Sequence, residues 1–305
     1  MRYINRTIWI LSLVSLFMDL ASEMLYPVVP VYLRSIGFSL LWIGLLEGLA
    51  EFTVSLTKGY FGHWSDQSGR RMPFIRTGYL LSALAKPLMA IYASVSWVFL
   101  SRTLDRLGKG VRSAARDALL SASTVSQYKA RVFNFHRSWD TVGAVLGPLA
   151  AMVLLGFTQG DYKPLFYLAF FPGLASVLLL FLIREPRVRQ EAKAHNGFFS
   201  YFSFYRSASP EYRKLIVALV LFGLANSSDV FLLLRAREVT GSDTIMITGY
   251  IVYNLVYAVS AFPVGIVADR WGHKKILCLG FLLFAAVYLG FSFNENTVMV
   301  FVLFG

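Results

Sequence analysis

Charged side chains lie inside long apolar stretches of this sequence, where each is costly unless it is paired or hydrated. Asp19, Glu23 and Tyr26 recur at helical spacing in the first stretch, so a helix would place them on one face. Glu47 and Glu51 are related in the same way in the second stretch. A carboxylate near the middle of a membrane could bind and release protons as its access to water changes. Asp19 and Glu23 are the leading candidate proton carriers.

A further stretch, residues 97–124, supplies the opposite charge. Its candidate cavity residues are Arg102, Asp105, Arg106 and Lys109. With a rise of about 1.5 Å per helical residue, Arg106 and Lys109 fall at about the depth of Asp19. This match predicts a charged, water-filled cavity whose spare basic charge favours an anionic or zwitterionic solute. The alternative is a static network of ion pairs that only holds the helices together.

The composition assigns the chain to a class. With 56% hydrophobic and 15% charged residues and a mean hydropathy of +0.58, the 305 residues carry more apolar surface than one soluble core requires. The net charge of +12 does not indicate nucleic-acid binding, because the basic residues lie mainly between the apolar stretches. We therefore predict an all-α polytopic membrane protein.

Enzyme and metal chemistry find no support in the sequence. The histidines are expected in or near loops and lack the spacing of metal ligands: His63, His136, His195 and His273. Cys278 is the single cysteine, so no disulfide or thiolate metal site is expected. No phosphate-binding, dinucleotide-binding or nucleophile motif occurs. We expect no enzyme activity, no cofactor and no metal.

Eight apolar stretches and one charged stretch are long enough to provide the roughly 20 residues that a helix needs to cross a bilayer. They are residues 8–33, 40–62, 74–93, 97–124, 133–156, 164–183, 214–234, 246–268 and 276–293, and a tenth begins near Thr297. The charged stretch 97–124 would suit a helix on the membrane surface. If it spans instead, Lys and Arg gather on the side of the N-terminus, and the opposite side holds only Arg34, Lys163, Arg235 and Arg237. That asymmetry favours a spanning segment and a cytoplasmic N-terminus.

Two turns about two hundred residues apart share one pattern, a glycine, an aspartate and a second glycine followed by basic residues. The first copy is Gly62, Asp66, Gly69, Arg70 and Arg71, and the second is Gly265, Asp269, Gly272, Lys274 and Lys275. Two copies, each placed after an apolar stretch, predict a duplicated membrane unit. Each aspartate could meet a neighbouring helix N-terminus or an arginine and so act as a conformational latch. The alternative is that the basic residues serve only to orient the chain in the membrane.

The repeated turns, together with Gly143, Gly147 and Pro148 in the fifth span, resemble the signatures of the major facilitator superfamily, in particular its drug/proton-antiporter branch. The resemblance implies two pseudo-symmetric halves of six helices, residues 1–183 and 214–305, joined by a cytoplasmic linker, residues 184–213. The second half would be incomplete, because the tenth span starts near the end of the sequence. We therefore expect a piece of a longer product.

The resemblance implies a secondary active transporter that moves a small solute by alternating access. Proton-coupled export is the first prediction. A facilitative or cation-coupled importer and a non-transporting receptor or scaffold are the alternatives. Asn226 and Asp229 in the seventh span are expected to add polar groups to the cavity from the second half. Protons and membrane lipids are the expected partners of a monomer in the bacterial inner membrane.

Overall fold

The computed structural model describes residues 4–158, 161–185 and 205–305, and within residues 261–273 some side chains are not described. All regular elements in these ranges are helices, so the predicted all-α fold is confirmed. The predicted linker, residues 184–213, lies mostly outside the described residues, as does His195.

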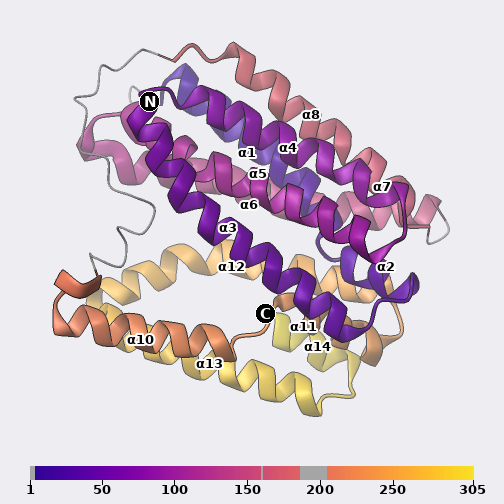
Figure 1. The fold of residues 1–305 in the computed structure, drawn as a ribbon. Coiled ribbons are helices and arrows are strands. Elements are labelled where there is room, and N and C mark those ends of the chain that lie inside the picture. The colour runs from indigo at the N-terminus through magenta and orange to yellow at the C-terminus, as the bar shows by residue number, and fades with distance from the viewer. Residues whose placement is uncertain (1–3, 159–160, 186–204) are drawn as a thin grey trace.

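The helices form two groups, which we name the N-terminal and the C-terminal half (Figure 1). The first contains α1 (Arg6–Leu25), α2 (Val29–Ser35), α3 (Leu40–Ser68), α4 (Met72–Ile91), α5 (Val95–Ala122), α6 (Lys129–Phe157), α7 (Lys163–Leu168) and α8 (Phe170–Leu179), with the 3₁₀ turns Ser126–Tyr128 and Leu180–Leu182. The second contains α10 (Pro210–Ala225), α11 (Asp229–Thr240), α12 (Asp243–Trp271), α13 (His273–Phe293) and α14 (Thr297–Phe304).

Polar residues between the apolar stretches determine where several helices begin. The side chains of Asn5, Ser39 and Ser94 each accept a backbone N–H from the first turn of α1, α3 and α5. Ser209 and Asn296 do the same for α10 and α14. Since the first N–H groups of a helix lack partners within it, such caps stabilise each start by about 1 kcal/mol.

The charged stretch 97–124 forms an interior helix rather than a helix on the outside of the bundle. It becomes α5, which packs along its length between α3 and α4. Glycines make this close approach possible, since a Cβ at Gly78 of α4 would lie 2.6 Å from the carbonyl oxygen of Gly108 of α5. By length and composition, six helical segments in the described ranges could cross a membrane, and α5, with its many charges, is not among them.

The first helical segment of each half is interrupted, near its C-terminal end in the N-terminal half and near its middle in the C-terminal half. The chain leaves the α-helix at residues 26–28 between α1 and α2, and at residues 226–228 between α10 and α11. In transporters, discontinuous helices of this kind supply polar groups to sites near the bilayer midplane. Each break lies beside carboxylates of the predicted cavity, Glu23 in the first half and Asp229 in the second.

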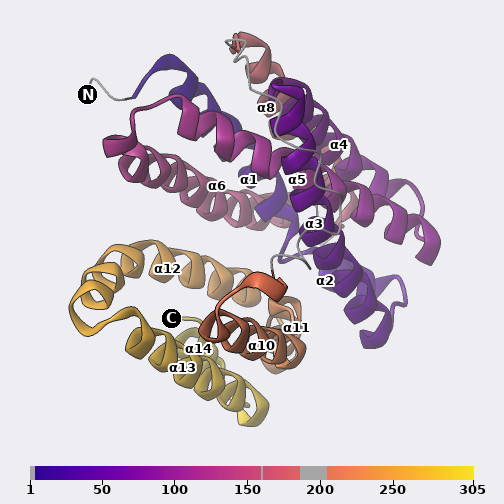
Figure 2. The ribbon, with the colours of Figure 1, turned by 60° about the vertical axis from the view of Figure 1, so that its left-hand side comes forward.

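The two halves meet at one end of the bundle, which we call the sealed end (Figures 1 and 2). Here α2 contacts α11, and α6 contacts α12. One buried apolar cluster contains Leu33 and Leu46 of the N-terminal half together with Leu233, Ile247 and Val300 of the C-terminal half. Burial of apolar side chains from both halves therefore stabilises this end.

The opposite end, which we call the repeat-turn end, carries the two repeated turns. In the first turn Gly69 ends α3 with a φ of 63°, and in the second Gly272 follows α12 with a φ of 89°. A positive φ strongly favours glycine, which explains why the pattern keeps a glycine at this position. Gly265 and Asp269 lie in the last turns of α12, but their side chains are outside the described set.

Candidate functional site

The glycine motif of the fifth span packs α6 directly against the charged face of α1. A Cβ at Gly143 would lie 2.6 Å from the carbonyl oxygen of Leu16, and one at Gly147 would lie 2.6 Å from the backbone nitrogen of Met24. α6 continues through Pro148, as α4 does through Pro87, so neither proline ends its helix. The two glycines thus fix the backbone of α1 on both sides of Asp19 and Glu23.

A cavity of about 240 Å³ lies among α1, α3, α4 and α5, and Tyr250 of α12 reaches it from the other half. Eight residues that the sequence assigned to a cavity line it: Asp19, Glu23, Tyr26, Glu51, Arg102, Asp105, Arg106 and Lys109. Lys86, Arg112 and Tyr250 also line it, and the sequence did not place them there. Glu47, Asn226 and Asp229 are not among its lining residues.

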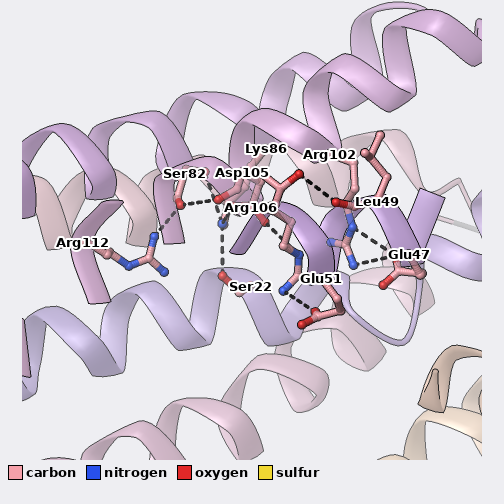
Figure 3. A network of polar contacts seen from close by, with 11 residues as sticks. Ser22, Glu47, Leu49, Glu51, Ser82, Lys86, Arg102, Asp105, Arg106 and Arg112 are labelled. Carbon is pink, nitrogen blue, oxygen red and sulfur yellow. Dashed lines mark hydrogen bonds and ion pairs between the residues drawn. The ribbon is translucent and has the colours of Figure 1, made fainter. Parts of the chain in front are cut away.

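Glu47 instead makes the shortest ion pair of this region, with Arg102 of α5 (Figure 3). The guanidinium donates from Nε and Nη2 to one carboxylate oxygen at 3.1 and 2.8 Å. Both side chains are over nine-tenths buried. Loss of either partner would leave the other as an uncompensated buried charge. The pair therefore favours keeping α3 and α5 together.

Arg106, one turn further along α5, has weaker partners. Its Nη1 lies 3.6 Å from a carboxylate oxygen of Glu51, a side chain that is 65% exposed, and its Nε lies 4.0 Å from Asp105. The Nε is buried and makes no hydrogen bond. Arg106 therefore enters the cavity wall without a close counter-ion.

Lys86 of α4 connects three helices. Its ammonium group lies 3.2 Å from the hydroxyl of Ser22 on α1, 3.5 Å from Asp105 on α5 and 3.3 Å from the carbonyl oxygen of Ser82 (Figure 3). The Ser82 hydroxyl in turn donates to the carbonyl oxygen of Asp105 and accepts from Arg112. A lysine in the middle of an apolar stretch is the signal that could have identified this position from the sequence.

The α1 carboxylates have few partners. Glu23 accepts a hydrogen bond from the Tyr250 hydroxyl at 2.7 Å, a contact that joins the two halves. Within the described ranges, Asp19 makes no hydrogen bond and no ion pair; its charged neighbours are Asp140, Glu23, Arg116 and Lys109. His136 and Asp140 of α6 form a largely buried pair at 3.3 Å, although the sequence had placed His136 in or near a loop.

Three tyrosines from both halves stack beside Glu23. The ring centroids of Tyr26 and Tyr250 are 5.4 Å apart with planes inclined by 26°, and those of Tyr250 and Tyr253 are 5.9 Å apart with planes inclined by 24°. Asn254 donates to the carbonyl oxygen of Tyr250 at 3.0 Å. Tyr250 is 6% exposed, so this arrangement fixes its hydroxyl toward Glu23.

The repeated turn of the N-terminal half differs from the predicted latch. Asp66 lies 3.7 Å from Arg71 of its own turn and is 57% exposed. The N-terminus of α4 is met by Glu185, which accepts the backbone N–H groups of Arg71 and Met72 at 2.7 and 2.9 Å. The sequence reasoning missed Glu185. Lys274 and Lys275 of the second turn are exposed.

A second inter-half group lies at the sealed end, at the start of α12. The Asp243 carboxylate accepts a hydrogen bond from the Tyr162 hydroxyl, in the connection between α6 and α7. It also accepts from Nε of Arg237, in the last turn of α11, at 2.5 Å. One carboxylate thus joins α12 both to its neighbouring helix and to the opposite half.

Comparison with known proteins identifies the family. The family model described as Major Facilitator Superfamily matches residues 11–305. The chain belongs to this superfamily. An uncharacterised superfamily transporter of Methanocaldococcus jannaschii is 29% identical over all of this chain and 77% of its own length. The quinolone resistance protein NorA of Staphylococcus aureus is 23% identical over 94% of this chain and 79% of its own length.

The fold also matches a solved superfamily structure. A bacterial homologue of the human lysosomal transporter Spinster, in an inward-facing and occupied conformation, superimposes with a TM-score of 0.76 at 17% identity. The match covers all of this chain and 71% of that one. The predictions of a superfamily member, of a multi-pass membrane protein and of a transporter rather than an enzyme are confirmed.

Proposed function

We propose that this protein is a proton-coupled transporter that exports a small solute by alternating access. The observation that carries the proposal is the Glu23–Tyr250 hydrogen bond, which links a cavity carboxylate of one half to a helix of the other. A hydrogen bond to a carboxylate is about twice as strong as one between neutral groups. Protonation of Glu23 would therefore weaken a contact between the halves, and proton binding would be coupled to their relative movement.

The asymmetry of the basic residues supports a cytoplasmic N-terminus. With that orientation the sealed end faces outward, as expected of an inward-facing state. Export would then begin with a solute entering from the cytoplasm, and the quinolone resistance relative is consistent with outward transport. The inner membrane of a prokaryotic cell is the compartment that this orientation suits.

The test is proton flux in liposomes that contain the full-length protein and a pH-sensitive dye. Addition of a transported solute should move protons, and either Asp19→Asn or Glu23→Gln should abolish that movement. Glu211→Gln is the matched control, because Glu211 is an exposed carboxylate at the start of α10. It should leave the flux unchanged.

Solute uptake should be followed in the same liposomes with labelled solute. Uptake that continues without proton movement, and that neither substitution changes, would overturn proton coupling. It would instead support a facilitator in which the cavity carboxylates only balance charge. Proton movement that survives in Glu23→Gln but not in Asp19→Asn would transfer the carrier role to Asp19.

A further inference from the structure

The cations along α5 differ in how well they are neutralised. Arg102 shares two hydrogen bonds with Glu47, but Arg106, Lys109 and Arg112 follow at intervals of three residues without an equivalent partner. Arg112 donates to the Ser82 hydroxyl and lies 4.5 Å over the Tyr79 ring, both of which are neutral groups. In the part of the chain that the structure describes, the side-chain ammonium group of Lys109 makes no ion pair or hydrogen bond. All three line the cavity.

Arg106 shows most directly that the positive charges of α5 lack close counter-ions. The residue is 8% exposed, its Nε makes no hydrogen bond, and its carboxylate neighbours lie beyond hydrogen-bonding distance. A buried charge without a hydrogen-bonded counter-ion is unfavourable. An acidic group of a bound solute would supply the missing partner, because a guanidinium presents several donors to one carboxylate or phosphate.

The opposite wall of the same cavity suits a cation. Glu23 has one hydrogen bond, from Tyr250, and in the described residues neither it nor Asp19 forms an ion pair. The rings of Tyr26 and Tyr250 stack on each other beside it, and both residues line the cavity. Aromatic rings next to a carboxylate form a favourable environment for an ammonium group. The two walls thus carry opposite charges that do not neutralise each other directly.

We propose that this cavity binds a small zwitterion, with its acidic group at Arg106 and Lys109 and its ammonium group at Glu23, Tyr26 and Tyr250. The inference deepens the proposed transport function and rests on it. A singly charged solute would satisfy only one wall: an anion would leave Asp19 and Glu23 unpaired, and a cation would leave the positive charges of α5 unpaired. The volume of about 240 Å³ is below the roughly 300–1,000 Å³ of typical ligand pockets, which favours a solute the size of an amino acid.

Binding to the purified full-length protein tests the assignment with three probes of equal chain length. They are 4-aminobutanoate, which carries both charges, butanoate, which carries the acidic group, and n-butylamine, which carries the ammonium group. Titration calorimetry should give a dissociation constant for 4-aminobutanoate at least about tenfold lower than for either singly charged probe. Equal affinities, or no binding of any of the three, would overturn the proposal.

Two substitutions test where the acidic group and the ammonium group of the ligand bind. Lys109→Gln should weaken 4-aminobutanoate about tenfold and leave n-butylamine unchanged, whereas Glu23→Gln should weaken both of these probes. Lys129→Gln, at an exposed lysine at the start of α6, is the control and should change neither. If Lys109→Gln and Lys129→Gln bind all probes alike, the acidic group does not lie at α5 and the assignment fails.

The binding assay separates this inference from the transport mechanism. Preferential binding of the zwitterion without proton movement in liposomes would retain the ligand class and overturn proton coupling. Proton movement driven by a singly charged solute, with no preference for the zwitterion, would retain the coupling and overturn the ligand class.

Discussion

The two ends of the bundle are held together in different ways. At the sealed end, side chains from both halves share an apolar cluster, and Asp243 bonds to Tyr162 of the opposite half. At the repeat-turn end, the polar contacts of Asp66, Arg71 and Glu185 all join parts of the N-terminal half. The sealed end is therefore stabilised by contacts that must break when the halves move, whereas these contacts at the repeat-turn end can persist.

The predicted latch would control the movement of the halves, but in this structure the first repeated turn and the contacts between the halves are separate features. The repeated turn contains the predicted latch residue Asp66, but in this conformation its carboxylate pairs with Arg71 in the same turn. Hydrogen bonds between the halves come from residues outside the repeated motif: Tyr162 with Asp243, Glu23 with Tyr250, and Arg137 with Tyr257. In the first copy, the described contacts of the motif lie within the N-terminal half.

Of the substitutions considered, removal of the Asp243 carboxylate should destabilise the sealed end most. Asp243→Ala leaves the Tyr162 hydroxyl and the Arg237 guanidinium without their shared acceptor. Because both partners are partly exposed, we expect a loss of about 1–2 kcal/mol from the sealed state, which is roughly tenfold in the open population. Ile247 lies between Asp243 and Tyr250 on one face of α12 and is fully buried. The rate of maleimide labelling of Ile247→Cys, in a Cys278→Ser background, should rise about tenfold.

Glu238→Ala is the matched control for this prediction. Glu238 pairs with Arg235 at 3.0 Å, at the same end of the bundle, but both residues belong to α11. Its loss should leave the labelling rate within a factor of about two, as for other exposed pairs within a helix. If both substitutions accelerate labelling equally, the contact between halves has no special role.

Loss of the Glu185 cap should destabilise the repeat-turn end without opening the sealed end. Glu185→Ala frees two backbone N–H groups at the start of α4, which costs about 1–2 kcal/mol. The melting temperature should fall by about 2–4 °C, and the labelling rate of Ile247→Cys should not change. Faster labelling would show that the two ends are coupled in this conformation.

Asp66→Asn is the control at the same turn. Its ion pair spans 3.7 Å and the carboxylate is mostly exposed, so we expect a change of at most about 0.5 kcal/mol. If this variant is as stable as the unmodified protein but no longer transports, the predicted latch forms in another conformation. If it is as unstable as Glu185→Ala, the exposed pair contributes more than its geometry indicates.

Helical periodicity explains why the sequence predicted much of the site. The spacing of Asp19, Glu23 and Tyr26 gives one helix face, and counting along α5 gives the depth of Arg106 and Lys109. Both properties depend only on local geometry, and the structure brings these residues into one cavity. The positions of basic residues favour a membrane-spanning segment at 97–124, and this stays a prediction; the structure shows a long helix there, packed between α3 and α4.

Choice of partner was not predictable in the same way. Periodicity does not show how neighbouring helices are rotated, so Glu47 was expected in the cavity although it faces Arg102. Tyr250 reaches Glu23 across 227 sequence positions. Glu185 caps α4 from the far end of the N-terminal half. Such contacts depend on packing between distant segments, and a single sequence carries no direct signal for them.

Loss of the Tyr162 hydroxyl should affect the sealed end less than loss of the Asp243 carboxylate. Tyr162→Phe removes one of two donors to Asp243 and leaves Arg237 in place, so the labelling rate of Ile247→Cys should rise about fivefold, for about 1 kcal/mol.

Burial and the hydrogen bond to Asp243 raise the pKa of Tyr162 to about 12. A raised pKa means that the stabilisation is complete below the ordinary tyrosine value of about 10 and is lost as the pH rises from about 10 toward 12. Each labelling rate is divided by that of the exposed Cys278 in the unmodified chain, measured at the same pH. The ratio of the labelling rates of Ile247→Cys with and without Tyr162→Phe should then stay constant from about pH 6 to pH 9. A ratio that falls to one within this range would show that another group, not the phenol, controls the sealed end.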